Sequence, residues 1–253
     1  MTRPSPAVTR RLLLLLVLVF WEVAPRTGLV PTLFLPPLSN AFIVAYHDQS
    51  IYLSNLVVTL GEVAVSMAIC CGGGVVLGAI IGSVPVLRHP LRTLFSSFYA
   101  IPLVILYPLM AAWLGIGPES KVAFASLYGI VPAILASAAG IQSIDPQLAL
   151  TARSMGATLP QRIAHVTIPA AIPSILSAIR IGGSLAIVGV VVAEMLTSAA
   201  GLGFLITSYR TILDSSRVFA AILFVLAIAL AFDALVRLLE RHTARWSVAD
   251  GQK

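Results

Sequence analysis

The side chains that could carry chemistry are few in this sequence, and they do not cluster. The four histidines, at positions 47, 89, 165 and 242, fall in separate loops and share no helical face, so they predict no metal site. The chain lacks an H-E-x-x-H zinc motif, a G-x-S-x-G nucleophile elbow and a G-x-x-x-x-G-K-S/T phosphate loop. We therefore expect a chain that is not an enzyme and binds neither a metal nor ATP.

Acidic residues are equally sparse where the chain is most apolar. Glu62, Glu194 and Asp233 each lie near one end of an apolar stretch. Ion-coupled carriers commonly keep ionisable groups in the middle of the membrane, whereas groups near the end of a span pair or reach the interface. Asp233 and Arg237 also have the i,i+4 spacing of a helical ion pair. These positions favour pairing at the interface over ion coupling.

Composition places these residues in a membrane protein. The 253-residue chain is 58% hydrophobic and only 10% charged, with a mean hydropathy of +0.99, whereas soluble domains carry about 25% charged residues. Its net charge of +6 comes from dispersed residues, with no run of Lys or Arg that could follow a phosphate backbone. The composition therefore indicates one membrane domain and argues against a nucleic-acid partner.

The elements that must position these residues are apolar helices. A helix needs about 20 apolar residues to cross the hydrocarbon layer, and the sequence predicts an all-α, polytopic protein with about six spans. The run 12–23 resembles the core of a signal peptide, but no small-x-small cleavage site follows it, so we expect a retained first helix. The six predicted spans are residues 12–23, 55–84, 94–114, 122–141, 170–196 and 218–238.

Prolines and basic residues refine this layout. Residues 88–92 are predicted to form a cytoplasmic turn, and 26–54 and 201–217 to form external loops. Pro102 and Pro108 are expected to kink the third span, and Pro132 to interrupt the fourth.

The positions of Lys and Arg test the orientation, because these residues concentrate on the cytoplasmic side. Eleven fall in predicted inner segments and four in outer ones, which predicts that both termini are cytoplasmic. The inner residues are Arg3, Arg10, Arg11, Arg88, Arg92, Arg153, Arg162, Arg237, Arg241, Arg245 and Lys253; the outer ones are Arg26, Lys121, Arg210 and Arg217.

The second span carries a stripe of small residues. Gly74, Gly78 and Gly82 recur at every fourth position, on one helical face. Small residues at this spacing let a second helix approach closely in lipid. The stripe predicts a helix-packing face, although glycines are also tolerated in membrane helices without such a role.

The polar segment between the fourth and fifth predicted spans is the most informative part of the chain. Residues 150–169 resemble the "EAA" loop of ABC importer permeases: Ala152 matches its second alanine, Gly156 its glycine and Pro169 its proline. Leu150 stands where the family has glutamate. We expect helix before Gly156 and a second short helix that ends at Pro169, with the glycine permitting the turn between them.

The resemblance extends over nearly the whole chain and is to the sulfonate/taurine/nitrate branch of these permeases. The further segments that carry it are Ile101-Pro102, Tyr107-Pro108-Leu109, residues 115–121, Val192-Ala193-Glu194-Met195 and Gly201-Leu202-Gly203.

The resemblance implies a type I ABC importer-like bundle in a bacterial inner membrane. Residues 1–11 would be a cytoplasmic N-terminus, 12–241 the transmembrane permease domain with its coupling loop at 142–169, and 242–253 a cytoplasmic tail. The partners would be a second copy of the chain, cytoplasmic ATPase subunits that hold ATP and Mg, an extracytoplasmic solute-binding protein and membrane lipid. The chain itself would bind no cofactor, and the solute would be a small anion such as a sulfonate, taurine or nitrate.

Site residues follow from the same resemblance. Pro102, Pro108 and Glu194 are candidates for the translocation path. The candidates for contact with the ATPase are Ala152, Arg153, Gly156, Ala157, Thr158, Leu159, Pro160 and Pro169.

Two other classes of function are compatible with such a composition. A secondary transporter would work without an ATPase, and such proteins often contain internal repeats; we find no convincing repeat here. An intramembrane enzyme or assembly scaffold is the third possibility. Co-purification with an ATPase subunit would distinguish the three.

Overall fold

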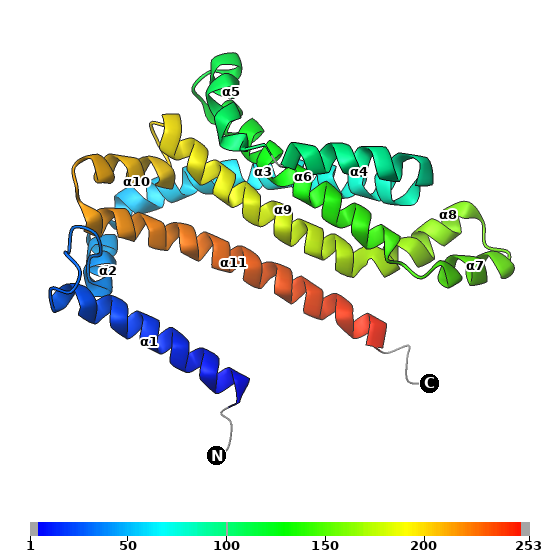
Figure 1. Ribbon diagram of the computed structural model, residues 1–253, viewed down its shortest axis with the longest axis horizontal. Coiled ribbons are helices and arrows are strands. Elements are labelled where there is room, and N and C mark those ends of the chain that lie inside the picture. Colours follow the sequence, from blue (N-terminus) through cyan, green and yellow to red (C-terminus); the bar gives the residue numbers. More distant parts are fainter. Residues whose placement is uncertain (1–4, 100, 249–253) are drawn as a thin grey trace. The chain divides into compact units, whose positions relative to one another are not determined.

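The computed structural model describes residues 5–99 and 101–248, and all regular structure in these ranges is helical (Figure 1). The predicted all-α fold class is therefore confirmed. The side chains of residues 6, 7, 99, 159 and 244–248 lie outside the described part. So do Arg3 and Lys253, which entered the charge count above.

Thirteen helical segments follow one another in the described ranges, two of them not α-helical: η1 is a 3-10 helix and η2 a π-helix. The segments are α1 (Pro6–Arg26), α2 (Leu38–His47), α3 (Gln49–Ser83), α4 (Pro85–Tyr99), η1 (Leu103–Leu106), α5 (Tyr107–Leu114), α6 (Pro118–Gln142), α7 (Pro146–Ser154), α8 (Leu159–Arg162), η2 (Ile163–Thr167), α9 (Ile168–Thr197), α10 (Leu202–Thr211) and α11 (Ser215–Val248).

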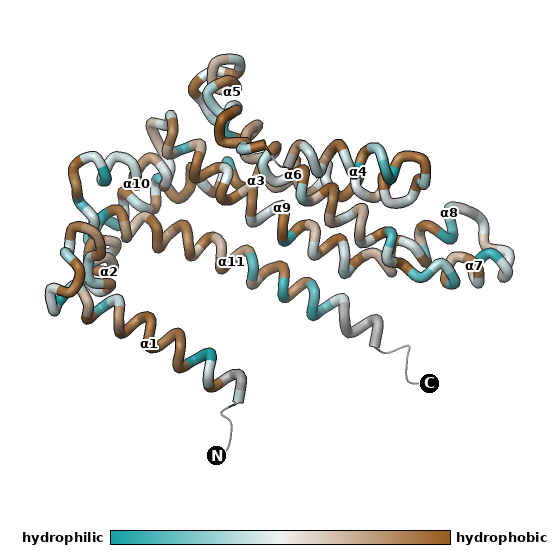
Figure 2. The backbone as a smooth tube through the Cα atoms, in the orientation of Figure 1, coloured by the Kyte–Doolittle hydropathy of each residue, from teal (hydrophilic) through white to brown (hydrophobic). Residues whose placement is uncertain are grey.

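Four helical stretches of the described residues are long and apolar enough to cross a membrane. They lie in α3, in α6, in Pro160–Thr197 (which contains α9) and in Ser215–Thr243 of α11; the bent pair formed by α4 and η1–α5 makes a fifth if it counts as one span. Figure 2 shows α1 as hydrophobic along its middle, but only ten residues separate its Arg11 from Glu22. The count of six spans stays a prediction.

The chain divides into two compact units. The first comprises Met1–Thr59 and Glu194–Ala227, and the second comprises Leu60–Ala193 and Ile228–Lys253. α3, α9 and α11 each contribute residues to both units.

Aromatic contacts hold the first unit together. The ring of Trp21 in α1 meets Phe219 of α11 edge-on, with centroids 5.6 Å apart. Tyr52 of α3 stacks on Phe224 at 5.2 Å and donates its hydroxyl hydrogen to the carbonyl of Arg217 at 3.0 Å. Such pairs contribute about 0.5–1.5 kcal/mol beyond their buried area.

Arg217 forms two ion pairs in the same unit. Its Nε lies 2.9 Å from Oδ2 of Asp48, and one terminal nitrogen lies 2.8 Å from Oδ2 of Asp214. Hydrogen bonds from His47 and from Arg217 hold the pKa of the Asp48 carboxyl below its usual value. The start of α11 is thereby tied to the junction between α2 and α3.

Three small-residue contacts hold the second unit together around α6. Close approach is possible because glycines leave room for neighbouring backbone. Gly189 of α9 faces Ala125, Gly182 faces Ala133, and Gly140 of α6 faces Ser174. α6 is correspondingly the most buried of the candidate spans.

The predicted cytoplasmic turn at residues 88–92 is wrong, because these residues are helical and belong to α4. Pro90 lies inside that helix, in its second turn, and lacks the N–H that would donate to the carbonyl of Val86. Leu91 and Phe95 pack against buried residues of α3 and α6. This apolar contact stabilises α4 through its basic segment.

The predicted third span, 94–114, is a bent pair of helical segments instead of one kinked helix, and the pair stays a candidate span. α4 ends at Tyr99, Pro102 caps η1, and Pro108 occupies the first turn of α5. Proline lacks an N–H and fits best at the start of a helix, so these two prolines begin new segments instead of kinking one helix.

Two predicted breaks are absent. α6 continues through Pro132, and the helix that was expected to end at Pro169 continues as α9, with this proline as its second residue. Packed neighbours let membrane helices accommodate proline. A third difference is α10, which lies in the predicted external loop 201–217.

Candidate coupling and helix-packing sites

The coupling segment begins with α7, whose two ends are capped. Asp145 accepts a hydrogen bond from the backbone N–H of Gln147 at 2.9 Å. At the other end, Gly156 has a φ of +80° and donates to the carbonyl of Arg153, and Ala157 donates to the carbonyl of Ala152. This is the Schellman pattern, which needs a left-handed residue after the helix.

α8 starts three residues after that glycine with a cap of its own. Both the backbone N–H and the hydroxyl of Thr158 donate to Oε1 of Gln161, at 2.8 and 3.0 Å. Thr158 and Gln161 thus form half of a capping box. α8 then runs through the π-helix η2 into α9, so the short helix is continuous with a candidate membrane span.

α7 and η2 pack against each other and enclose a hollow of about 500 Å³. No residue of either segment is buried. Leu150 is 62% exposed and Met155 81% exposed, which in an aqueous loop leaves apolar surface for a partner to cover. The hollow is lined by Ala152, Met155, Gly156, Ala157, Gln161, His165 and Val166.

The structure brings together some of the predicted coupling residues and leaves others apart from the hollow. Ala152, Gly156 and Ala157 line it, whereas Thr158 and Pro160 are exposed beside it in sequence. Pro169 lies in α9. The side chain of Leu159 lies outside the described part.

The predicted glycine stripe packs against α6 of the same chain. A Cβ added at Gly74 would lie 2.5 Å from Cβ of Ala133, and one at Gly78 would lie 2.5 Å from Cβ of Ser137. A Cβ at Gly82 would lie 2.8 Å from Cβ of Ile141. None of the three positions can accept a side chain without displacing α6.

Sequence reasoning found only half of this stripe. The four-residue spacing continues upstream through Cys70, Ser66 and Glu62, all buried. The opposing face of α6 has the same spacing, with Lys121, Ala125, Gly129, Ala133, Ser137 and Ile141. The spacing was visible in the sequence, but its polar and sulfur-bearing members hid the pattern.

A buried ion pair closes one end of this helix contact. The ammonium of Lys121 contacts Oε1 of Glu62, and the two side chains are 7% and 5% exposed. Removing one partner of such a pair leaves an uncompensated buried charge, which costs about 3–5 kcal/mol. The pair therefore fixes the alignment of α3 against α6.

Glu194 occupies a second polar cluster, in the first unit. It is 1% exposed. Its Oε1 accepts from the hydroxyl of Thr59 at 2.7 Å, and its Oε2 accepts from the backbone N–H of Gly203 at 2.7 Å. The N–H of Leu202 donates to the Thr59 oxygen at 2.9 Å, and that of Gly201 to Asn55 at 2.7 Å.

This cluster caps α10. The first N–H groups of a helix have no partner within it and favour negative charge. Glu194, reaching from α9, supplies a carboxylate that sequence-local capping could not provide. Of the other candidates for the translocation path, Pro102 and Pro108 are both exposed and belong to the second unit.

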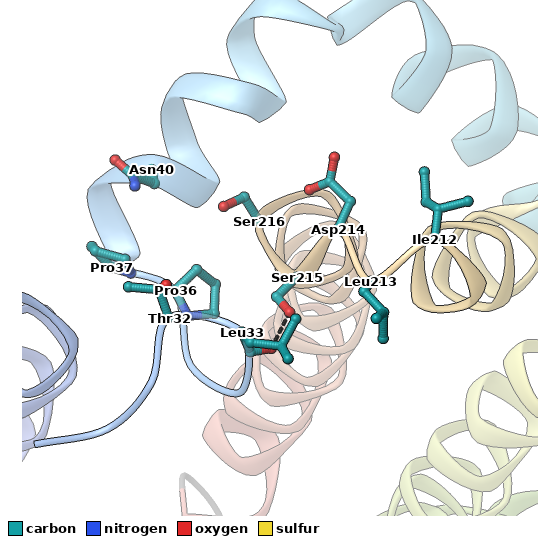
Figure 3. A pocket seen from close by; sticks show the side chains of 10 residues that line it. All are labelled: Thr32, Leu33, Pro36, Pro37, Asn40, Ile212, Leu213, Asp214, Ser215 and Ser216. Atoms are coloured by element: carbon teal, nitrogen blue, oxygen red, sulfur yellow. Dashed lines mark hydrogen bonds between the residues drawn. The ribbon is translucent and has the colours of Figure 1, made fainter. Parts of the chain in front are cut away.

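A further hollow, of about 540 Å³, lies in the first unit between the loop after α1 and the α10–α11 turn (Figure 3). The hydroxyl of Ser215 donates to the carbonyl of Leu33 across it. Leu213, on its rim, has a left-handed φ of +60°. Asp214 is already paired with Arg217, so this hollow presents hydrogen-bonding groups and no unpaired carboxylate among its described lining residues.

Comparison with known proteins decides the family. The model for the "binding-protein-dependent transport system inner membrane component" matches residues 74–245, which is more than half of the chain. The chain belongs to this family. It is the permease subunit of an ABC transporter, and the resemblance predicted from the coupling segment is confirmed.

Curated relatives extend this match over almost the full length. The chain is 29% identical to the taurine transport system permease protein TauC of Escherichia coli (strain K12), covering 92% of this chain and 87% of that protein. It is 28% identical to the putative aliphatic sulfonates transport permease protein SsuC of Bacillus subtilis (strain 168), covering 91% and 84%. It is 30% identical to the riboflavin transport system permease protein RibX of Chloroflexus aurantiacus, covering 96% and 92%.

Solved permease chains share the fold. A chain of the inward-facing MetNI methionine ABC transporter is similar with a TM-score of 0.60 at 21% identity, over 75% of this chain and 96% of that one. A chain of an amino acid ABC transporter gives 0.59 at 22% identity, over 79% and 98%. The predicted importer-type bundle is confirmed at the level of fold.

Proposed function

We propose that two copies of this permease form the translocation pathway for a small organic or inorganic anion in the bacterial inner membrane. Cytoplasmic ATPase subunits would bind ATP and Mg and drive transport, while this chain binds no cofactor. An extracytoplasmic solute-binding protein would deliver the solute. Both termini would be cytoplasmic, as the excess of inner Lys and Arg supports.

The observation that carries this proposal is the coupling segment, which has no buried residue in α7 or η2. Residues 152–165 run from the end of α7 through the turn at Gly156 into α8 and η2. Exposed apolar residues here, such as Met155, leave a surface for a partner. α8 is continuous with α9 through η2, so a push on the short helix from an ATPase would be passed to a membrane span. Docking surfaces of this kind concentrate their free energy in a few residues.

The solute class rests on the relatives' names. Two of those reported above are named for taurine, a zwitterion that carries a sulfonate group, and for aliphatic sulfonates, which are anions. Others are named for riboflavin and for formylaminopyrimidine. We place the pathway near Pro102 and Pro108, and assign Glu194 the role of holding α10 because both of its carboxylate oxygens already accept hydrogen bonds.

Uptake measurements test the proposal. The permease would be co-purified with its ATPase and binding protein, reconstituted, and loaded with ATP on the cytoplasmic side. We expect ATP-dependent uptake of a labelled sulfonate or taurine, with unlabelled riboflavin as a poor competitor. Uptake without an ATPase, or uptake of riboflavin in preference to every small anion, would contradict it.

A further inference from the structure

Within the coupling segment, residues 146–167 carry basic side chains and no acidic ones. The basic residues are Arg153, Arg162 and His165. The nearest preceding carboxylate, Asp145, is engaged as the cap of α7. The next one in the sequence is Glu194, which belongs to the other compact unit.

The two arginines have no carboxylate partner in the part of the chain that the structure describes. Arg26, Arg180, Arg217 and Arg237 each pair with a carboxylate, but Arg153 and Arg162 form no ion pair with any residue in the described ranges. Nε of Arg162 is buried and has no hydrogen-bond partner there. The positive charge of both guanidinium groups is therefore available to a partner that supplies carboxylates.

The two arginines are sequence neighbours of residues that line the hollow. Ala152 and Gln161 line the hollow between α7 and η2, and Arg153 and Arg162 follow them directly in sequence. Met155, at its edge, is 81% exposed. The surface thus combines an apolar hollow with two unpaired guanidinium groups, which bind carboxylates in a bidentate manner.

We infer that this surface selects an ATPase subunit whose docking groove presents an apolar side chain flanked by carboxylates. The inference rests on the proposed function and adds the chemistry of the partner. Leu150 stands where the resembled loop has glutamate, so the one acid that would have offset the arginines is absent. Complementary charge speeds association and excludes wrong partners, so an ATPase with a basic groove would be rejected.

Anionic lipid is the competing explanation for unpaired arginines at a membrane surface. Electrostatic lipid binding generally requires clusters of about four to eight basic residues, and this segment has two arginines beside an apolar hollow. The test below therefore uses nanodiscs of zwitterionic lipid, in which lipid charge cannot contribute.

The experiment measures the affinity of the cognate ATPase subunit for the full-length permease in these nanodiscs. We would compare four proteins at low and high salt. They are wild type, the double variant Arg153→Glu/Arg162→Glu, its conservative counterpart Arg153→Lys/Arg162→Lys, and Arg241→Glu as a control at an exposed position of α11. We expect the charge reversal to weaken binding at least about tenfold and to abolish its salt dependence. The lysine variant should retain most of the affinity, and Arg241→Glu should match wild type.

Three results would overturn the inference. They are salt-independent binding by wild type, unchanged affinity of the charge-reversed variant, and a charge dependence that appears only when anionic lipid is added. These results are separable from a failure of the proposed function. If Gly156→Glu abolishes stimulated ATP hydrolysis while the arginine variants bind normally, the segment couples to the ATPase but the acidic-groove inference is wrong.

Discussion

The backbone N–H of Gly203 donates to the buried carboxylate of Glu194 at 2.7 Å, so one helix of the permease is capped by a residue of the helix before it. Gly201, two residues earlier, has a φ of +106° and passes so close to this carboxylate that a Cβ would collide with it. The Glu194 carboxylate can therefore occupy this position only because residue 201 is a glycine.

Substitutions in this cluster should destabilise the first unit. Glu194→Ala removes a charged acceptor from Thr59 and Gly203 and should cost about 2–3 kcal/mol. Gly201→Ala should be at least as severe, because left-handed backbone costs a non-glycine residue about 1–2 kcal/mol before any collision. Thermal unfolding in detergent would measure both. Gly61→Ala is the control, since a Cβ there meets nothing within 4 Å; equal tolerance of Gly201→Ala would contradict the capping role.

The glycine stripe should tolerate no added side chain. Gly78→Ala places a Cβ 2.5 Å from Cβ of Ser137, and overpacking of this kind costs about 1–3 kcal/mol. Gly72→Ala, where the added Cβ meets nothing within 4 Å, should be neutral. The amount of folded permease in the membrane and its unfolding temperature distinguish the two variants, and identical behaviour would mean that α3 and α6 are not in close contact.

Parts of this architecture were predictable from local pattern and parts were not. The spacing of Gly74, Gly78 and Gly82 identified a packing face because small residues repeat at helical period. The turn at Gly156 was predicted because the run of helix-favouring residues stops there, and the structure gives this glycine a positive φ. The cap that Glu194 provides for α10 joins residues from separate helices, and no local pattern encodes it. The turn predicted at residues 88–92 is wrong for the same reason, because local pattern does not encode contacts between separate helices. Packing of α4 on α3 and α6 outweighs the preference of proline for a turn.

The ion pairs of Arg180 should contribute more to the free energy of unfolding than the ion pair of Arg237. Arg180 lies 2.8 Å from Glu240 and 3.3 Å from Asp233, with its side chain 34% exposed. Arg237 is 61% exposed and, among the described residues, pairs with Asp233 only. Arg180→Gln should cost about 1–2 kcal/mol and Arg237→Gln less than about 1 kcal/mol. Unfolding of both single variants and the double variant would measure the coupling, and the reverse ranking would contradict a role for Arg180 in joining α9 to α11.

The orientation of the permease makes a separate prediction. Reporter fusions placed after Ser120 and after Thr211 should be external, and a fusion after Gln161 should be cytoplasmic, because inner segments carry the excess of Lys and Arg. Alkaline phosphatase and fluorescent-protein reporters give opposite signals on the two sides. An external Gln161 would contradict both the orientation and the proposed contact with an ATPase.

Stimulation of ATP hydrolysis in a Gly156→Glu complex tests the central claim most directly. A Cβ at this position meets nothing within 4 Å, so the variant should insert and fold, but its φ of +80° disfavours any residue other than glycine or asparagine. We expect Gly156→Glu to lose most solute-stimulated hydrolysis while Gly156→Asn and Leu150→Ala retain it. Normal stimulation in a correctly inserted Gly156→Glu complex would contradict the assignment of residues 152–165 as the coupling element.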